Sequence, residues 1–167
     1  MSTLTSRLAH RTHAARAAGA LAGALLLIAV LASGVLGASP ERLATQITDD
    51  VGELGGTRSA VQQALDDLQR TDNVQLWVWF TDTTDGSAAA DFATETAKLS
   101  SFGGNDLLLV IAMTDHAYGY WKSSIPLSNA QLDTVLGADL EPSLKAGDNG
   151  GAIVATATGI RLSLIHI

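Results

Sequence analysis

The sequence predicts an α/β layered sandwich, with helices on both faces of a small mixed sheet, behind an N-terminal hydrophobic helix. Residues 74–80 and 107–113 are short apolar runs of the kind that form buried strands. Segments with helical spacing of apolar residues lie before, between and after these runs. The order strand, helix, strand indicates a right-handed βαβ unit, which places the two strands parallel in one sheet.

The composition excludes several classes of function. The chain has 167 residues and no cysteine, so it has no disulfide framework, thiol nucleophile or zinc ribbon. All 17 acidic residues lie at or after Glu41, and residues 41–160 carry only six basic residues, a net charge of −11. A body this acidic argues against a nucleic-acid partner, because proteins that bind nucleic acids normally carry a basic stripe.

The N-terminus has the pattern of a targeting or anchoring segment. Residues 1–16 contain Arg7, Arg11 and Arg16 and no acidic residue, and residues 17–38 carry no charge at all. By the positive-inside rule, residues 1–16 are a basic cytoplasmic region, and the acidic body that follows is exported.

Two alternatives remain open for residues 17–38. As a transmembrane anchor they would hold the acidic domain at the cell membrane, outside the cytoplasm. As a signal peptide they would be cleaved near the small residues Gly34, Gly37 and Ala38, and the protein would be secreted. The apolar length lies between the ranges typical of the two.

Residues 39–45 are a short polar linker, and residues 46–160 form the folded domain. Gly55-Gly56-Thr57 supplies a turn and an N-cap, and the helical spacing of Val61, Leu65 and Leu68 predicts a helix of about three turns.

The first apolar run, residues 74–80, is apolar on both faces and therefore predicts an interior strand. Asp85-Gly-Ser is a turn and cap signal, and the spacing from Phe92 to Leu99 predicts the next helix, which Gly103-Gly104-Asn105 ends. The second run, residues 107–113, then returns parallel to the first.

The rest of the domain continues the alternation. Residues 117–121 predict an antiparallel strand nearer an edge, and Ser128 and Gln131 have the spacing of a capping box at the start of a helix. An alanine-rich helical segment follows from Asp148 to Ile160. Residues 161–167 (RLSLIHI) do not fit the end of a domain, and we interpret them as a non-native tail.

Three segments of this body resemble the TPM domain family. Residues 47–54 (ITDDVGEL) are similar to its opening D-x-A-G-x-L box. Residues 102–112 (FGGNDLLLVIA) are similar to its G-x-x-N-x-G-x-L-L-L-[IV]-A strand signature, and residues 141–153 (EPSLKAGDNGGAI) to its closing P-x-[FL]-x-x-G-D-x-x-x-G segment. The three boxes occur in the family's order and cover almost the whole body.

The resemblance implies a three-layer α/β/α, Rossmann-like sandwich outside the cytoplasmic membrane or in the thylakoid lumen, behind a signal or anchor. The plant lumenal member is associated with acid phosphatase activity and photosystem II repair, and some bacterial members bind calcium or magnesium. This sequence departs from the family at Leu107, where glycine is usual, at Asn129, where aspartate is usual, and at residues 121–126, which replace a glycine-rich turn. These changes bear on the ion or substrate site more than on the fold.

Four side chains are candidates for a calcium or magnesium site, because both ions prefer hard oxygen ligands. They are Asp49, Asp50, Asn105 and Asp106. The second pair precedes a buried strand, and we expect the fold to bring it near the first pair. In the alternative interpretation, all four only cap turns and helix ends.

Asp82 and Asp115 are a further candidate site. Each follows the carboxyl end of an apolar strand, where α/β sheets gather their ligands. The alternative is that both are ordinary loop acids. His116 is the only histidine of the body, and no serine lies in a G-x-S-x-G elbow, so serine-hydrolase chemistry is not expected.

We therefore expect an extracytoplasmic, membrane-associated TPM-domain module that supports binding, assembly or quality control and binds a divalent cation. Its partners would be the membrane, through the N-terminal helix, and another membrane protein, with no nucleic acid. The alternative is a divalent-metal-assisted acid phosphatase in which Asp50 and neighbouring acids hold the ion. The small number of basic residues in the body disfavours a phosphate site.

Overall fold

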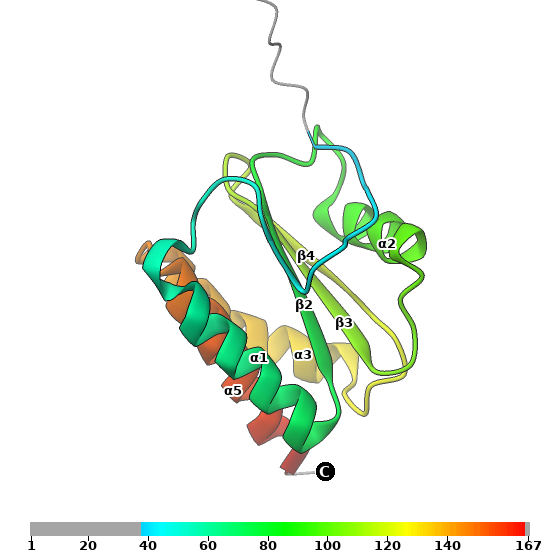
Figure 1. The fold of residues 1–167 in the computed structure, drawn as a ribbon, viewed down its shortest axis with the longest axis vertical. Helices are drawn as coiled ribbons and strands as arrows, with labels where there is room; N and C mark the ends of the chain where they lie inside the picture. The colour runs from blue at the N-terminus through cyan, green and yellow to red at the C-terminus, as the bar shows by residue number, and fades with distance from the viewer. Residues whose placement is uncertain (1–37, 166–167) are drawn as a thin grey trace, which may run out of the picture. The chain divides into compact units, whose positions relative to one another are not determined.

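A computed structural model describes residues 38–165. Its sheet is mixed and has the order β1-β2-β3-β4, in which β1, β2 and β3 are parallel and β4 is antiparallel to β3 (Figure 1). The strands are β1 (Ile47–Asp49), β2 (Gln75–Thr81), β3 (Asp106–Ala112) and β4 (Ala117–Lys122). The predicted mixed sheet, the parallel βαβ unit and the antiparallel edge strand are therefore confirmed.

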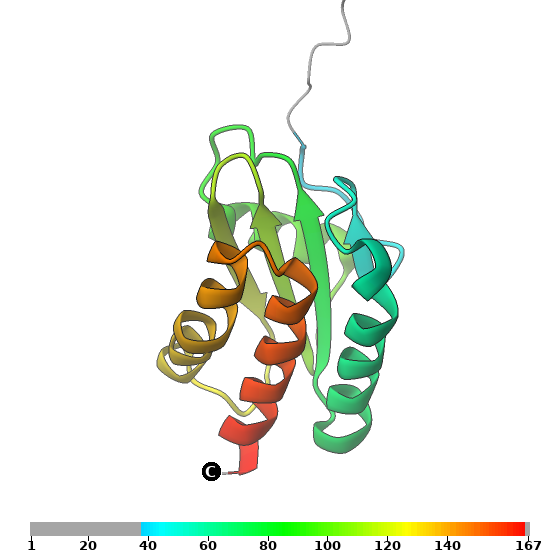
Figure 2. The ribbon, with the colours of Figure 1, turned by 90° about the vertical axis from the view of Figure 1, so that its left-hand side faces the viewer.

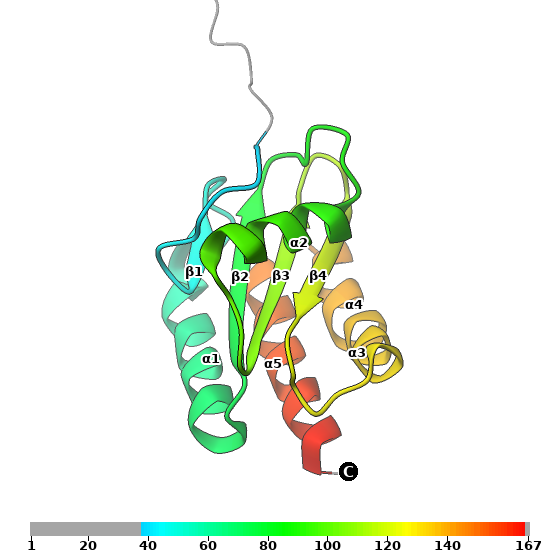
Figure 3. The same ribbon diagram turned by 90° about the vertical axis from the view of Figure 1, so that its right-hand side faces the viewer.

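The helices lie on both faces of this sheet. One face carries α2 (Ala89–Ser100), and the opposite face carries the other helices (Figures 2 and 3). These are α1 (Arg58–Asp72), α3 (Asn129–Val135), α4 (Glu141–Lys145) and α5 (Asn149–Ile165), with a 3-10 turn at Gly55–Thr57 and a π-helical turn at Leu136–Leu140. The domain is thus layered as helix, sheet, helix.

Successive side chains of β2 and β3 point to opposite faces of the sheet, and this alternation divides the core into two clusters, one on each face. Leu76, Val78 and Phe80 of β2 are buried against the layer that contains α1 and α5. Trp77 and Trp79 face α2 instead. Both strands lie between neighbours, so the expectation that β2 is an interior strand with two apolar faces is correct.

The helix caps were predicted less well than the helices. The capping box of α3 is present, because the Ser128 hydroxyl accepts the Gln131 N–H and the Gln131 side chain accepts the Ser128 N–H. Thr57 occupies the N-cap position of α1, as expected, but its side chain makes no capping hydrogen bond. Thr57 already has helical dihedrals because a 3-10 turn leads into α1, and its hydroxyl donates to the carbonyl of Leu54. The cap position of α2 is Ala88, without a capping side chain.

Three elements were not predicted. Strand β1 has only three residues, too few to show a two-residue alternation, and the region from 136 to 145 folds as a π-helical turn followed by α4. Helix α5 continues through Arg161, whose Nε lies 3.2 Å from an Asp72 carboxylate oxygen of α1. The interpretation of residues 161–167 as non-native stays a prediction.

The predicted N-terminal hydrophobic helix lies outside the described residues, as do the basic region 1–16 and nearly all of 17–38. Among residues 38–165, no helix combines the length and the apolar character needed to cross a membrane.

Candidate functional site

The three parallel strands end at the same edge of the sheet, and the loops that follow them carry most of the predicted site residues. Asp49 ends β1 opposite Phe80 of β2, whereas Asp106 begins β3 opposite Gln75. Five residues of β2 separate these two levels, a distance of about 17 Å along the strand. The expectation that Asn105 and Asp106 lie near Asp49 and Asp50 in one metal site is therefore wrong, because the two pairs lie at opposite ends of the sheet.

At the first of these ends, Asp49 and Asp50 have separate structural partners. The two carboxylate oxygens of Asp49 accept the backbone N–H groups of Glu53 and Leu54, at 2.9 and 3.0 Å. One oxygen of Asp50 accepts the indole N–H of Trp79, at 2.7 Å. The capping interpretation thus describes Asp49, and Asp50 has a partner that its sequence neighbours did not reveal.

At the opposite end, Asn105 and Asp106 fix the start of β3. Asp106 accepts the indole N–H of Trp77 at 3.2 Å and the backbone N–H of Gly103 at 2.9 Å. The main-chain carbonyl of Asn105 accepts the N–H of Gln75 at 3.0 Å. Both residues thereby join the turn before β3 to the first residues of β2.

Asp82 and Asp115 follow adjacent strands, and the structure brings their loops together. Asp82 accepts the hydroxyl of Thr114 at 2.5 Å, while Asp115 accepts the hydroxyls of Thr83 and Thr84 at 2.9 to 3.0 Å. The backbone N–H of Thr84 also donates to Asp115, at 2.7 Å. This backbone hydrogen bond, followed by the hydroxyl of Thr83, lowers the pKa of Asp115 below its usual value. The carboxylate is therefore held in its ionised form.

No cluster of three or more His, Asp or Glu side chains suited to a metal ion occurs in the part of the chain that the structure describes. Calcium usually takes six to eight oxygen ligands, which come from carbonyls and waters as well as from carboxylates.

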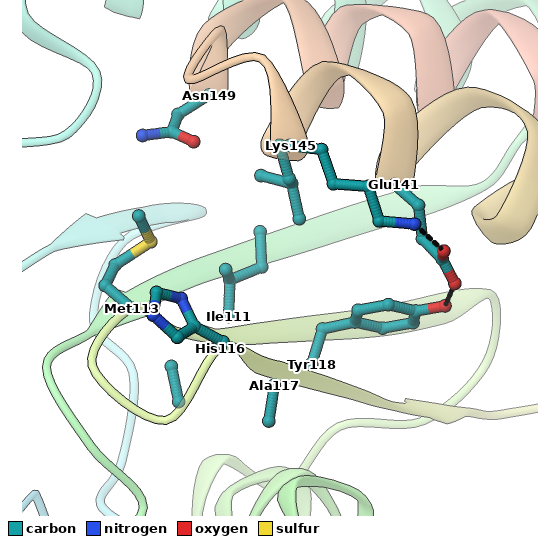
Figure 4. A pocket seen from close by; sticks show the side chains of 10 residues that line it. Ile111, Met113, His116, Ala117, Tyr118, Glu141, Lys145 and Asn149 are labelled. Atoms are coloured by element: carbon teal, nitrogen blue, oxygen red, sulfur yellow. Dashed lines mark hydrogen bonds and ion pairs between the residues drawn. The ribbon is translucent and has the colours of Figure 1, made fainter.

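A pocket of about 520 Å³ lies at the same edge of the sheet, between the end of β3, the turn into β4, and helices α4 and α5 (Figure 4). The sequence did not predict it, because its walls come from two segments, 111–118 and 141–149, that are separated by 22 residues. Its lining combines apolar and polar residues, namely Ile111, Ala112, Met113, Ala117 and Leu144 with His116, Tyr118, Glu141, Lys145 and Asn149.

Three polar side chains on one wall of the pocket form a hydrogen-bonded chain. The Tyr118 hydroxyl donates to one oxygen of Glu141 at 2.9 Å, and the Lys145 ammonium donates to the other at 2.8 Å (Figure 4). Burial, followed by this hydrogen bond to Glu141, raises the pKa of Tyr118 to about 12. Lys145, followed by Tyr118, lowers the pKa of Glu141. At neutral pH the phenol is therefore neutral and the carboxylate is ionised.

Asn149, the first residue of α5, lies on another wall of the pocket and is only 7% exposed. Its Nδ2 donates to a carboxylate oxygen of Glu53, in the loop after β1. A carboxylate only accepts, so this bond fixes the orientation of the amide. The buried Oδ1 of Asn149 accepts no hydrogen bond from any described residue. A polar residue at a helix start gives no signal of this kind in the sequence.

Comparison with known proteins identifies the family. A sequence profile of the TPM domain matches residues 47–162, from β1 into the last turns of α5. The chain belongs to the TPM domain family. The resemblance carried by the three sequence boxes is confirmed. Two of these boxes meet in the structure, since Glu53 of the first and Asn149 of the third share a hydrogen bond.

Two curated relatives are the UPF0603 proteins MT2410 and Rv2345 from two strains of Mycobacterium tuberculosis. Each is 35% identical over 147 residues, which covers 83% of this chain but only 22% of the relative. The TPM-domain chain thus spans about a fifth of the length of these proteins.

Two solved structures share the fold. The N-terminal domain of the cg2496 protein from Corynebacterium glutamicum has a TM-score of 0.63 and 25% identity, covering 77% of this chain and 86% of that one. An N-terminal domain from a P. gingivalis protein has a TM-score of 0.62 at 17% identity, covering 72% and 84%. The second likeness concerns the fold alone.

Proposed function

We propose that this TPM domain is a binding module that works outside the cytoplasm, held at the membrane by its N-terminal segment. The observation that carries the proposal is the pocket at the carboxyl edge of the sheet. It has the size of a small-molecule site, an apolar floor, a polar wall and one buried acceptor to which no described residue donates. In α/β sheets ligands gather at this edge, beyond the carboxyl ends of the strands.

The location rests on charge and hydropathy. A basic N-terminal region, an uncharged segment and a body of net charge −11 are the pattern of an exported domain. A retained anchor would place the module beside membrane proteins, which we propose as the partners in assembly or quality control. A cleaved segment would release it.

Protease protection tests the location. Protease added to intact cells should digest the acidic body, while a cytoplasmic control protein should survive until the cells are lysed. Protection of the body to the same degree as the cytoplasmic control would contradict the proposal.

Ligand-dependent unfolding tests the binding function. Thermal unfolding of the full chain, followed by circular dichroism, should move to higher temperature in a small-molecule extract of the source cells, because a ligand of the folded state stabilises it. Met113 projects into the pocket (Figure 4), so Met113→Trp should fill part of it and abolish the shift. An extract that stabilises neither protein, or both equally, would overturn the assignment of binding to this pocket.

A bound calcium or magnesium ion is a second part of the proposal. The loops after β2 and β3 offer the carboxylates of Asp82 and Asp115 and the hydroxyls of three threonines within hydrogen-bonding distance of them. These are oxygen ligands of the type that both ions take.

Metal-assisted acid phosphatase chemistry is the second candidate function. The observation that favours it is Lys145 in the lining of the pocket, at the sheet edge that also carries Asp82 and Asp115. A cation beside a bound divalent ion would stabilise a phosphoryl group. Hydrolysis of p-nitrophenyl phosphate by the full chain with Mg²⁺ should then fall in a variant with both Asp82→Asn and Asp115→Asn. Activity no greater than that of a buffer blank would rule this candidate out.

A further inference from the structure

We propose that the pocket takes a small primary amine with an apolar body, and that the ammonium group donates to the buried Oδ1 of Asn149. This inference rests on the proposed binding function and specifies the ligand. Nothing in the fold uses this acceptor, since no described residue donates to it. A buried amide oxygen without a donor destabilises the fold, and a donating ligand would remove that cost.

The identity of the free atom follows from Glu53. The Glu53 carboxylate has no proton to donate when ionised, so the atom of Asn149 that faces it must be the NH₂ group. The other amide atom, which is left for the pocket, is therefore the oxygen. An acceptor selects a donor and rejects a carboxylate or phosphate oxygen at the same position.

The charges around the pocket favour a cationic donor over a neutral one. Glu53 lies directly behind the Asn149 amide, while Glu141 on the opposite wall is paired with Lys145. Lys145 and Glu141 offset each other, which leaves the charge of Glu53 within a body of net charge −11.

Two groups oppose a cation at this position. The positive end of the α5 dipole lies at Asn149, but the Asp148 carboxylate accepts the Gly151 N–H in the same turn and partly offsets it. The imidazole of His116, which also lines the pocket, is the second group, because positive charge on its ring would repel an ammonium group.

The apolar part of the ligand has a defined place. Ile111 and Met113 at the end of β3 line the pocket (Figure 4), and Leu144 of α4 lines it as well. A branched chain of four or five carbons would cover these side chains, and each CH₂ group that it buries would tighten binding about fourfold.

Three probes of one shape test the head group: 3-methylbutylamine, 3-methylbutan-1-ol and 3-methylbutanoate. Each is titrated into the isotope-labelled full chain at pH 7.5, and the NMR shifts of the Asn149 side-chain amide and the Met113 methyl group are followed. We expect the amine to bind most tightly, the alcohol about tenfold more weakly, and the carboxylate not at all. Equal or tighter binding of the carboxylate or the alcohol would overturn the proposal, as would no binding of the amine.

Two variants locate the effect. Asn149→Ala should weaken amine binding about tenfold or more. Glu53→Gln keeps an acceptor for the Asn149 NH₂ group, and it should weaken binding of the amine but not binding of the alcohol. If Asn149→Ala does not fold, the Glu53→Gln result decides, and equal binding of the amine to wild type and Glu53→Gln would overturn the charge argument. Stabilisation by the cell extract without binding of the amine would leave the binding function in place and refute only this ligand class.

Discussion

Asp50 accepts a hydrogen bond from Trp79, a side chain that is only 1% exposed. The residue chosen from the sequence as a metal ligand therefore already satisfies a buried donor. The same holds for Asp49, Asp106 and Asp115, each of which accepts at least two hydrogen bonds within the fold. Loss of any of these carboxylates should affect stability before it affects a ligand.

Replacing Asp50 with alanine leaves the buried indole N–H of Trp79 without its acceptor. We expect the free energy of unfolding to fall by about 1–3 kcal/mol in the presence of a metal chelator. Asp50→Asn keeps an acceptor oxygen, so its free energy of unfolding should fall clearly less than that of Asp50→Ala. Urea unfolding of the three proteins measures these differences. An Asp50→Ala variant as stable as wild type in chelator would show that the hydrogen bond contributes nothing.

The hydrogen bonds to Asp115 make stability depend on pH. Because the pKa is lower in the folded state, the carboxylate stabilises the fold above its unfolded pKa, and this contribution is lost as pH falls through the lower, folded pKa. Wild type should therefore melt above Asp115→Asn at pH 7, and the gap should narrow once the pH falls below about 4.

Calorimetry between pH 7 and about 2.5 tests this behaviour, with Asp85→Asn as the control. Asp85 is exposed and lies in the same loop as Thr83 and Thr84, so its replacement should leave the pH profile unchanged. A gap between wild type and Asp115→Asn that stays constant down to the lowest pH would contradict the linkage.

At the scale of the elements, α2 depends on close contact with β4. A Cβ atom on Gly119 would lie 2.3 Å from the backbone carbon of Ala89 and the backbone nitrogen of Ala90, at the start of α2. Backbone atoms at this distance cannot move aside as the end of a side chain can. The helix can therefore rest on the sheet only where β4 has no side chain.

Gly119→Ala should lower the free energy of unfolding by about 1–3 kcal/mol or more, since α2 must shift away from the sheet. Gly103→Ala is the matched control, because a Cβ atom there meets nothing within 4 Å, and its effect should stay within about 0.5 kcal/mol. Denaturant unfolding of both variants gives the comparison. Equal stability of the two would mean that α2 tolerates a side chain beneath it.

The sequence predicted the elements whose signal is local and long enough. The runs that form β2 and β3 show continuous apolar character, and the Ser128 capping box has a fixed spacing, so both were found. Strand β1 is three residues long and acquires its identity only by pairing with β2. The π-helical turn at Leu136–Leu140 likewise follows from packing and has no signature of its own.

The same distinction applies to the candidate site. Asp82 and Asp115 were correctly expected at one edge, because the carboxyl ends of parallel strands always meet there. The expectation that Asp49 and Asp50 lie near Asn105 and Asp106 was wrong, because the distance between the two pairs depends on the register of the sheet. The pocket was missed because the burial of Asn149 and its bond to Glu53, 96 residues away, arise only in three dimensions.

For the whole molecule, the divalent-cation proposal has a thermodynamic consequence. Millimolar calcium or magnesium should raise the unfolding temperature of the full chain relative to chelator. At a hundred times the dissociation constant, the bound ion adds about 2.7 kcal/mol to the free energy of unfolding. The shift should persist in Asp50→Asn and vanish when Asp82→Asn and Asp115→Asn are combined. Equal unfolding temperatures of wild type in metal and in chelator would contradict a divalent site.

The division of the core by the sheet also divides its chromophores. All three tryptophans, Trp77, Trp79 and Trp121, belong to the cluster under α2, whereas both tyrosines, Tyr118 and Tyr120, pack against the opposite layer. Intrinsic tryptophan fluorescence therefore reports on one layer of the domain, and tyrosine absorbance reports on the layer that holds the pocket. Recording both signals during unfolding would reveal whether the two layers melt as one cooperative unit or in succession.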